Sequence, residues 1–179
     1  MVCFSCDEKE SHVPKLHFCV DEATLEIISV VASTNDVSDA EALPDLLQDA
    51  PGEIEQVSAD GSYDQRRCYD TLNRYGARAA IPPRKGARIW SHANSKAERH
   101  ARDENLRRIR KVGRKEWKQE SNYHRRSLAE TTVFRFKTIF GGRLQTRQIG
   151  NQFKELMLKS AILNRMTHLG MPDSVKIAG

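Results

Sequence analysis

The sequence has no apolar run long enough to cross a membrane. Its uncharged apolar stretches all fall well short of the roughly 18 residues that a transmembrane helix requires. The first residues also lack the basic start and apolar core of a secretory signal peptide. We therefore expect a cytoplasmic protein with no membrane span.

Cysteine is too scarce for a disulfide framework. The four cysteines lie at irregular intervals, at positions 3, 6, 19 and 68. The pair Cys3-x2-Cys6 has the spacing of zinc ligands, but no second Cys or His pair follows at a typical interval. These features disfavour structural zinc and indicate reduced thiols.

Acidic residues are scarce in the middle of the chain, although the whole chain carries a formal charge of only +5. Residues 1–83 hold 6 basic and 16 acidic side chains, residues 84–126 hold 15 and 5, and residues 127–179 hold 8 and 3. The basic charge is therefore concentrated in one block of a 179-residue chain that suits a single domain. Such a block indicates a polyanionic partner, or else a helix that is basic for solubility.

Alternating apolar residues predict strands at 16–20 and 26–32, joined as an antiparallel hairpin by a short polar connection. Ser38 and Glu41 then form a capping box that opens a helix to about Asp49. Pro44 lies beyond the first helical position, so the start could shift toward Ala42.

A β–α–β unit follows. The strand at 53–59 ends at Asp60, Asp64 is placed to cap a helix that reaches about Tyr75, and a short strand covers 77–81. In open α/β sheets, ligands bind at the carboxyl ends of strands. Asp60 is therefore a candidate site residue in a mixed α/β fold, although a lone strand-end aspartate is often only a turn residue.

Helices account for most of the remaining chain. A charged helix is predicted from Asn94 or Ser95 to Val112, with a thin apolar edge typical of an insertion that faces a partner. Trp117 marks a short helix, in which a core role is favoured over stacking on a base. The last helix, from Arg147 to about Leu169, is expected to bury six apolar residues: Ile149, Phe153, Leu156, Met157, Ala161 and Leu163.

The segment from Tyr123 to Lys137 is predicted to form one helix. At about 100° per residue, Tyr123, Arg126, Glu130 and Lys137 fall within an arc of roughly 60°. An acid, two cations and a phenol would then share one stripe beside an apolar flank that includes Val133, Phe136 and Phe140. The alternative is an ordinary solvated helix with an ion pair between positions 126 and 130.

The spacing Tyr-x2-Arg-x3-Glu-x6-Lys resembles a signature of DDE-class insertion-sequence transposases of the four/five supergroup. The resemblance includes S-A-D-G-S-Y-D, A-I-P-P-R-K and R-S-L-A-E-T. It extends over residues 15–170 as a partial catalytic domain, leaving an irregular start at 1–14 and a tail at 171–179.

This resemblance implies a ribonuclease-H-like (retroviral-integrase-like) core with a helical insertion and C-terminal helices. Asp60 and Glu130 match the family's second and third catalytic acids, which hold Mg²⁺ or Mn²⁺. Tyr123, Arg126 and Lys137 would contact DNA. Other basic residues would grip its backbone: Arg84, Lys85, Arg107, Arg108, Lys111, Arg114 and Lys115.

The sequence departs from the family at the first acid, which relatives carry on a strand before the hairpin. Asp7 is the only aspartate upstream of Lys15, and its setting S-C-D-E-K-E matches neither the motif nor a strand. We therefore expect a truncated core that lacks its first strand and is inactive alone. Its partners would be DNA in the nucleoid and a second copy or a full-length transposase. The alternatives are a non-catalytic DNA-binding protein that modulates an intact transposase, and a chain that does not fold alone because a sheet edge is exposed.

Overall fold

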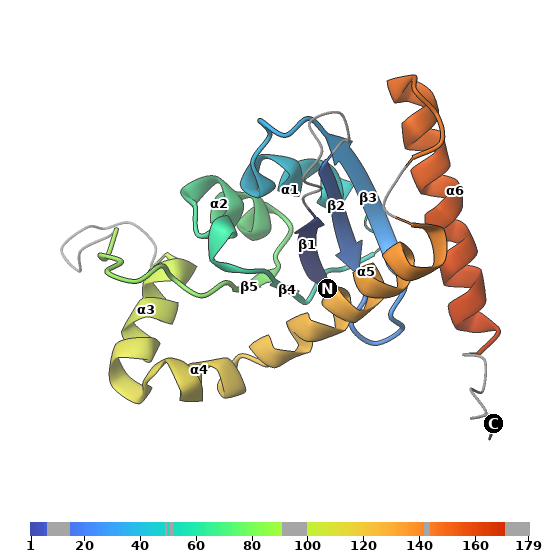
Figure 1. The fold of residues 1–179 in the computed structure, drawn as a ribbon. Helices are drawn as coiled ribbons and strands as arrows, with labels where there is room; N and C mark the ends of the chain where they lie inside the picture. Colours follow the sequence, from blue (N-terminus) through green and yellow to red (C-terminus); the bar gives the residue numbers. More distant parts are fainter. Residues whose placement is uncertain (7–14, 49, 51, 91–99, 142–143, 171–179) are drawn as a thin grey trace, which may run out of the picture.

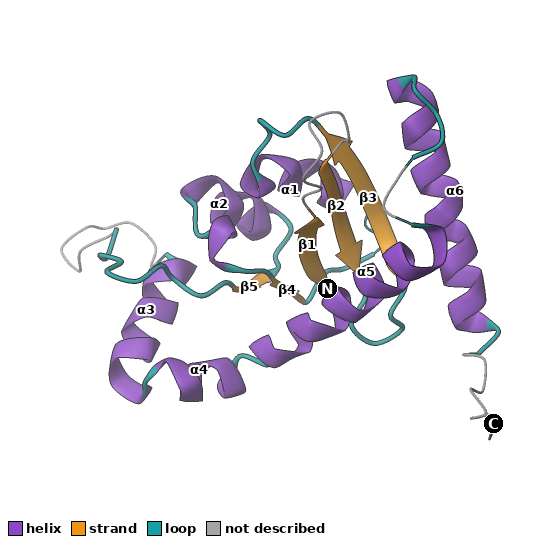
Figure 2. Ribbon diagram, in the orientation of Figure 1, coloured by secondary structure: helices purple, strands orange, loops and turns teal. Residues whose placement is uncertain are grey.

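The computed structural model describes residues 1–6, 15–48, 50, 52–90, 100–141 and 144–170. Five strands form one mixed sheet in the order β3-β2-β1-β4-β5, and helices cover both of its faces (Figures 1 and 2). The fold is mixed α/β, as expected. None of the described helices is both long and apolar enough to cross a membrane.

The sheet has a strand before the hairpin, so the predictions of a missing strand and of an irregular start are wrong for residues 2–6. Strand β1 (Val2–Cys6) lies at the centre, antiparallel to β2 (Lys15–Val20) and parallel to β4 (Gln56–Ser58). The physical reason is that β1 pairs with an edge of β2 and an edge of β4, which would otherwise have no partner. Asp7 lies outside the described residues.

The predicted hairpin and capping box are confirmed. Strand β3 (Ile27–Ser33) pairs with β2 in antiparallel register, and α1 (Asp39–Gln48) starts directly after the capping box. The backbone N–H and the hydroxyl of Ser38 donate to Glu41 Oε2 at 2.9 and 2.7 Å. Pro44 does not delay the helix. It removes the N–H that would bond the Ala40 carbonyl, and the Cys68 thiol lies 3.8 Å from that oxygen instead.

The β–α–β unit is also confirmed, with one exception. Strand β5 (Arg78–Ala80) pairs parallel to β4, and α2 (Arg66–Arg74) connects them. Asp64 does not cap α2, because the N-cap position belongs to Gln65 and the Asp64 carboxylate instead binds Arg102.

Two cores lie on opposite faces of the sheet. On one face, α1 and α2 pack against Cys3, Cys19 and strands β4 and β5. On the other face, Val2 and Phe18 pack against α5 (Ser127–Phe140) and α6 (Ile149–His168). The Phe18 and Phe136 rings meet edge to face, with centroids 5.2 Å apart. Successive side chains of β1 and β2 thus point alternately into one core and the other.

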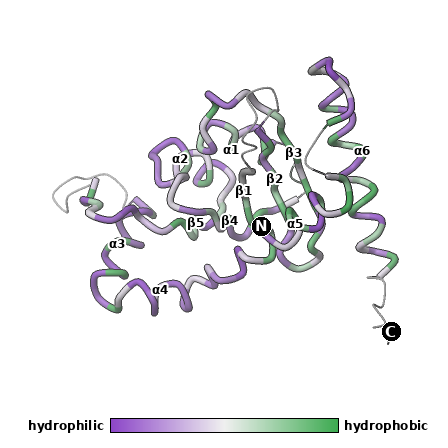
Figure 3. The backbone as a smooth tube through the Cα atoms, viewed as in Figure 1, coloured by the Kyte–Doolittle hydropathy of each residue, from purple (hydrophilic) through white to green (hydrophobic). Residues whose placement is uncertain are grey.

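Helices α3 (Ala101–Val112) and α4 (Arg114–Glu120) extend away from the sheet and are largely hydrophilic (Figures 1 and 3). The predicted start of the first of them, at Asn94 or Ser95, lies outside the described residues. Trp117 is 2% exposed, which is the expected core role.

The prediction of one helix from Tyr123 to Lys137 is wrong in its first turn. Residues Tyr123–Arg126 form a 3₁₀ turn, η2, and α5 begins only at Ser127. Asn122, with φ of 54°, separates η2 from α4. Its left-handed backbone therefore ends the preceding helix and redirects the chain.

The last helix buries less than predicted. Leu156 and Leu163 are fully buried, whereas Phe153 and Met157 are 43% and 48% exposed. Ala161 is exposed too, and the side chain at position 149 lies outside the described residues. A 20-residue helix at the side of a sheet contacts it along one narrow stripe, so the remaining apolar residues stay outside the core.

Candidate functional site

Asp60 lies just beyond the carboxyl end of β4, as predicted. Its carboxylate accepts a hydrogen bond from Ser62 N at 2.7 Å and caps the short 3₁₀ turn Gly61–Tyr63, η1. The Ser62 hydroxyl also bonds the Asp60 carboxylate and lies 2.9 Å from Asp39 Oδ2. Two carboxylates from β4 and α1 therefore converge on one hydroxyl.

Asp39 is compensated by a neighbouring cation. Lys15 Nζ lies 2.6 Å from Asp39 Oδ1, and both side chains are 12% exposed. The buried His17 lies behind them, with Nε2 2.8 Å from Ser33 Oγ. This end of the sheet is thus a packed polar network in which the Asp60 carboxylate has no ion pair with any described residue.

Glu130 lies in the first turn of α5, next to η2. Its carboxylate pairs with Arg126 at 2.6 Å and is 44% exposed. The Arg126 guanidinium in turn lies 5.7 Å from the centre of the Tyr123 ring. The ion pair that the alternative interpretation predicted is therefore present, and it leaves one side of Glu130 open to solvent.

Tyr123 connects the two candidate acids. Burial raises the pKa of Tyr123, Arg126 opposes that rise, and the carboxylates of Asp60 and Glu130 both add to it. Gln56 of β4 donates to the Ser121 carbonyl at 3.1 Å, which fastens the strand that leads to Asp60 beside the start of η2. The tertiary structure thus brings together the segments that lead to Asp60 and to Tyr123 from positions far apart in the chain.

Lys137 is further away from this region. It lies in the last turn of α5, seven residues after Glu130, which corresponds to about 10 Å along a helix axis. A DNA backbone that ran from Glu130 along α5 would reach Lys137. No described residue pairs with it.

The described residues do not form a complete metal site. No group of three or more His, Cys, Asp or Glu side chains is placed to hold a metal ion among them. Val2 of β1 pairs with Ser58 of β4, and two residues further along each segment are Phe4 and Asp60. Since β1 reads V-C-F-S-C, the strand beside Asp60 supplies no carboxylate.

The arginines predicted to bind DNA are mostly held by the protein itself. Arg84 Nε donates to the Gly61 carbonyl at 3.2 Å, and Arg114 Nη2 donates to the Pro83 carbonyl at 2.7 Å. Arg107 pairs with Glu104 at 2.6 Å, and Arg108 pairs with Glu120. Three lysines, by contrast, are exposed and have no ion pair or hydrogen bond with any described residue: Lys85, Lys111 and Lys115.

Arg102 is a buried cation of the insertion that no sequence pattern marks as a site residue. Arg102 Nε lies 2.7 Å from Asp64 Oδ1, and its guanidinium stacks 3.9 Å from the centre of the Trp90 ring. The backbone N–H of Trp90 in turn donates to both oxygens of the Asp103 carboxylate, at 2.9 and 3.1 Å. One basic residue among fifteen in a charged block carries no sequence signal that it is buried.

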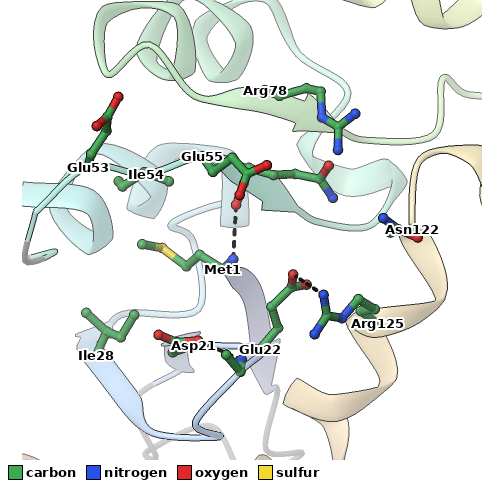
Figure 4. Close-up of a pocket in the computed structure, with 12 residues that line it drawn as sticks. Met1, Asp21, Glu22, Ile28, Glu53, Ile54, Glu55, Arg78, Asn122 and Arg125 are labelled. Carbon is green, nitrogen blue, oxygen red and sulfur yellow. Dashed lines mark hydrogen bonds and ion pairs between the residues drawn. The ribbon is translucent and has the colours of Figure 1, made fainter.

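A pocket of about 310 Å³ opens elsewhere, at the segment that leads into β4 (Figure 4). The α-amino group of Met1 donates to the Gln56 carbonyl at 3.0 Å, and Glu22 and Arg125 point toward each other across the opening at 3.0 Å. None of the predicted catalytic or DNA-binding residues lines it. It therefore lies beside η2, through Asn122 and Arg125, but does not include the candidate acids.

Comparison with known proteins identifies the family of this chain. No solved structure gives a significant match to this chain. A family model described as the transposase DDE domain matches residues 3–165, which includes β1, Asp60, Glu130 and nearly all of α6. Since the match extends over most of the 179 residues, the chain belongs to the DDE transposase family.

Proposed function

We propose that this chain acts in DNA transposition as a DNA-binding protein that carries two of the three carboxylates of a DDE site. The observation that supports this most directly is the hydrogen bond from Gln56 of β4 to the Ser121 carbonyl at 3.1 Å, because it joins the strand that leads to Asp60 to the segment that leads to Tyr123 and Glu130. If the Arg126–Glu130 ion pair only kept the helix soluble, its helix would not need to start beside the strand that leads to Asp60. In a ribonuclease-H-like core, strand ends and one helix supply the acids.

DNA binding is supported by the lysines at positions 85, 111 and 115. They are exposed, and they lie on or next to the helices that extend from the sheet. Ammonium groups of this kind bind phosphates as point charges regardless of base sequence. Arg126 is a further candidate, because a DNA phosphate near Glu130 and a bound cation could recruit its guanidinium.

We also propose that the chain does not cut DNA unaided. Strand cleavage in this family depends on Mg²⁺ or Mn²⁺, which would stabilise the charge that develops on the leaving oxygen. Among the described residues, only Asp60 and Glu130 match the family's acids, no group of three ligands is placed to hold a metal ion, and β1 offers no third acid. Two carboxylates leave such ions with too few protein ligands to fix their geometry.

The test is a cleavage assay with insertion-sequence end DNA and Mn²⁺. We expect a retarded protein–DNA complex and no nicked product. Nicking that disappears in Glu130→Gln would show that the site is complete, and would overturn the proposed inactivity. Nicking that persists in Glu130→Gln and in Asp60→Asn would overturn the assignment of both acids.

A second candidate function is modulation of an intact transposase. It is favoured by the combination of exposed lysines with an incomplete acid set, because such a protein would occupy DNA ends without processing them. Adding the purified chain to an intact relative's reaction should lower its rate in proportion to the occupied DNA. A shared elution peak of the two proteins would show direct association, and a dimer peak of the chain alone would show self-association.

A further inference from the structure

Two buried cysteines face each other at the centre of the sheet. Cys3 of β1 and Cys19 of β2 are directly opposite in the antiparallel register, and their sulfur atoms are 3.0 Å apart. The two residues are 1% and 0% exposed. No part of the proposed function uses either of them.

This geometry suits a disulfide. Opposed residues in antiparallel strands have Cα atoms about 4.5–5.5 Å apart, and disulfides span Cα separations of about 4.4–6.8 Å. The sulfur atoms need to approach by only about 1 Å to reach a bond length of about 2.05 Å. Small side-chain rotations achieve this without moving either strand.

We propose that Cys3 and Cys19 are a redox modification site, reduced in the resting protein and joined as a disulfide by a hydroperoxide. One thiolate attacks a peroxide oxygen and the O–O bond breaks. Hydroxide departs, and that sulfur becomes a sulfenic acid. The second thiolate attacks this sulfur, the S–O bond breaks, and a second hydroxide leaves. The two thiol protons convert the hydroxides to water when hydrogen peroxide is the oxidant. Two electrons pass from the thiols to the peroxide.

Burial of the two thiols in the core slows the attack of the first thiolate on the peroxide. Both sulfurs lie inside the core, and burial raises the pKa of the Cys19 thiol well above its usual range, which disfavours the reactive thiolate. Strand β1 is held to β4 by one described ladder pair, Val2 and Ser58, and by two hydrogen bonds of Met1, to the Gln56 carbonyl and from Ser58 N, whereas it pairs with β2 at five positions. Oxidation therefore proceeds through partial release of β1, and it should accelerate in mild denaturant that leaves the fold largely intact.

The disulfide would stabilise the sheet at its central strand, β1. Strand β1 joins the β2–β3 hairpin to the β4–β5 pair, so its release exposes the edges of β2 and β4. A covalent link between β1 and β2 restricts the unfolded chain and keeps β1 attached to β2. Oxidation would thus replace the purely noncovalent attachment of β1 to β2 with a covalent one.

The experiment treats the full, reduced chain with hydrogen peroxide, alkylates the remaining thiols and maps the peptides. Chymotryptic cleavage after Phe4 separates Cys3 from Cys6, so the linked cysteines can be identified. We expect one intramolecular Cys3–Cys19 link, faster formation in mild urea, and a midpoint of thermal unfolding raised by several degrees. A thiol reductant should reverse that rise.

A variant with Cys6→Ser and Cys68→Ala retains only the proposed pair and should show the same link and the same rise. Cys19→Ser should show neither. Recovery of both Cys3 and Cys19 as alkylated thiols, or of a link from either one to Cys6, Cys68 or a second chain, would overturn the proposal. Peptide mapping of the unaltered chain decides between these outcomes even if the double variant does not fold. The cleavage and DNA-binding assays do not enter this test, so it is independent of the proposed function.

Discussion

Arg102 of α3 and Asp64 of the turn after Asp60 form a buried ion pair, with Nε and Oδ1 2.7 Å apart and the side chains 5% and 1% exposed. The same Asp64 carboxylate accepts the backbone N–H of Arg84 at 2.9 Å. The basic insertion is therefore attached to the Asp60 turn by a network within the protein. Its orientation relative to the candidate acids depends on these contacts.

Removing this cation should be strongly destabilising. Arg102→Ala leaves Asp64 buried without its partner, and such changes cost about 3–5 kcal/mol of unfolding free energy. Arg102→Lys should be intermediate, because the ammonium group lacks the guanidinium fork and its stacking on Trp90. Urea denaturation followed by circular dichroism measures both effects.

Arg107→Ala is the matched control in the same helix. Arg107 pairs with Glu104 at the surface, with side chains 35% and 45% exposed, so its loss should cost less than about 1 kcal/mol. Equal losses for Arg102→Ala and Arg107→Ala would show that the buried pair does not anchor the insertion.

Asn164 should anchor α6 to the sheet. Its side-chain amide donates to the Ile27 carbonyl at 2.8 Å and accepts from Ile27 N at 2.8 Å, which satisfies both backbone groups at the start of β3. Asn164→Ala removes both bonds, and we expect a loss of about 1–3 kcal/mol of unfolding free energy. The exposed neighbour Arg165→Ala should change it by less than about 0.5 kcal/mol. A neutral Asn164→Ala would contradict the anchoring role.

Glu155 should make stability depend on acid pH. Burial raises the pKa of Glu155, but hydrogen bonds from Lys159, Gln145 and Thr146 together lower it to about 2. Because the folded-state pKa lies below the usual value of about 4.3, this stabilisation is present above that value and is lost as pH falls toward about 2.

The comparison that isolates this carboxylate is Glu155→Gln, which keeps the side-chain size. The difference in thermal midpoint between the two proteins should be largest above pH about 4.3 and should shrink toward pH about 2. Parallel curves across this range would show that the ionised carboxylate contributes nothing.

The three lysines should determine the salt dependence of DNA binding. Each phosphate contact contributes about 0.9 to the slope of log affinity against log salt, so replacing Lys85, Lys111 and Lys115 with Ala should reduce that slope by about 2–3. Fluorescence anisotropy with labelled duplex DNA measures the slope. Lys154→Ala is the control, because α6 lies on the other side of the molecule from α3 and α4 (Figure 1). An unchanged slope in the triple variant would place the DNA elsewhere.

Local patterns were sufficient to predict several elements. The capping box of Ser38 and Glu41 involves bonds between residues three apart, so its chemistry is complete within one turn. The hairpin and the β–α–β unit follow from alternation and turn residues in the same local way. The position of Asp60 at a strand end follows from that unit.

Other features depended on partners that are distant in the sequence. The sequence predicts an irregular start because five residues without a clear pattern carry too little signal, and only the two neighbouring strands decide that residues 2–6 form β1. Arg84 and Arg102 lie in the same basic block of the sequence as the exposed lysines. Their guanidinium groups nevertheless bond the Gly61 carbonyl and the Asp64 carboxylate of the protein itself.

The sequence by itself determined the family, the mixed α/β class and the two acids that match the DDE pattern, since these rest on residue types at fixed spacings. Only the tertiary structure decided that Gln56 of β4 bonds the segment before Tyr123, that β1 fills the centre of the sheet without an acid, and that Cys3 meets Cys19. The physical reason is that charge interactions, strand pairing and sulfur contacts depend on distances through space. Those distances are fixed by the packing of the two cores on either side of the sheet.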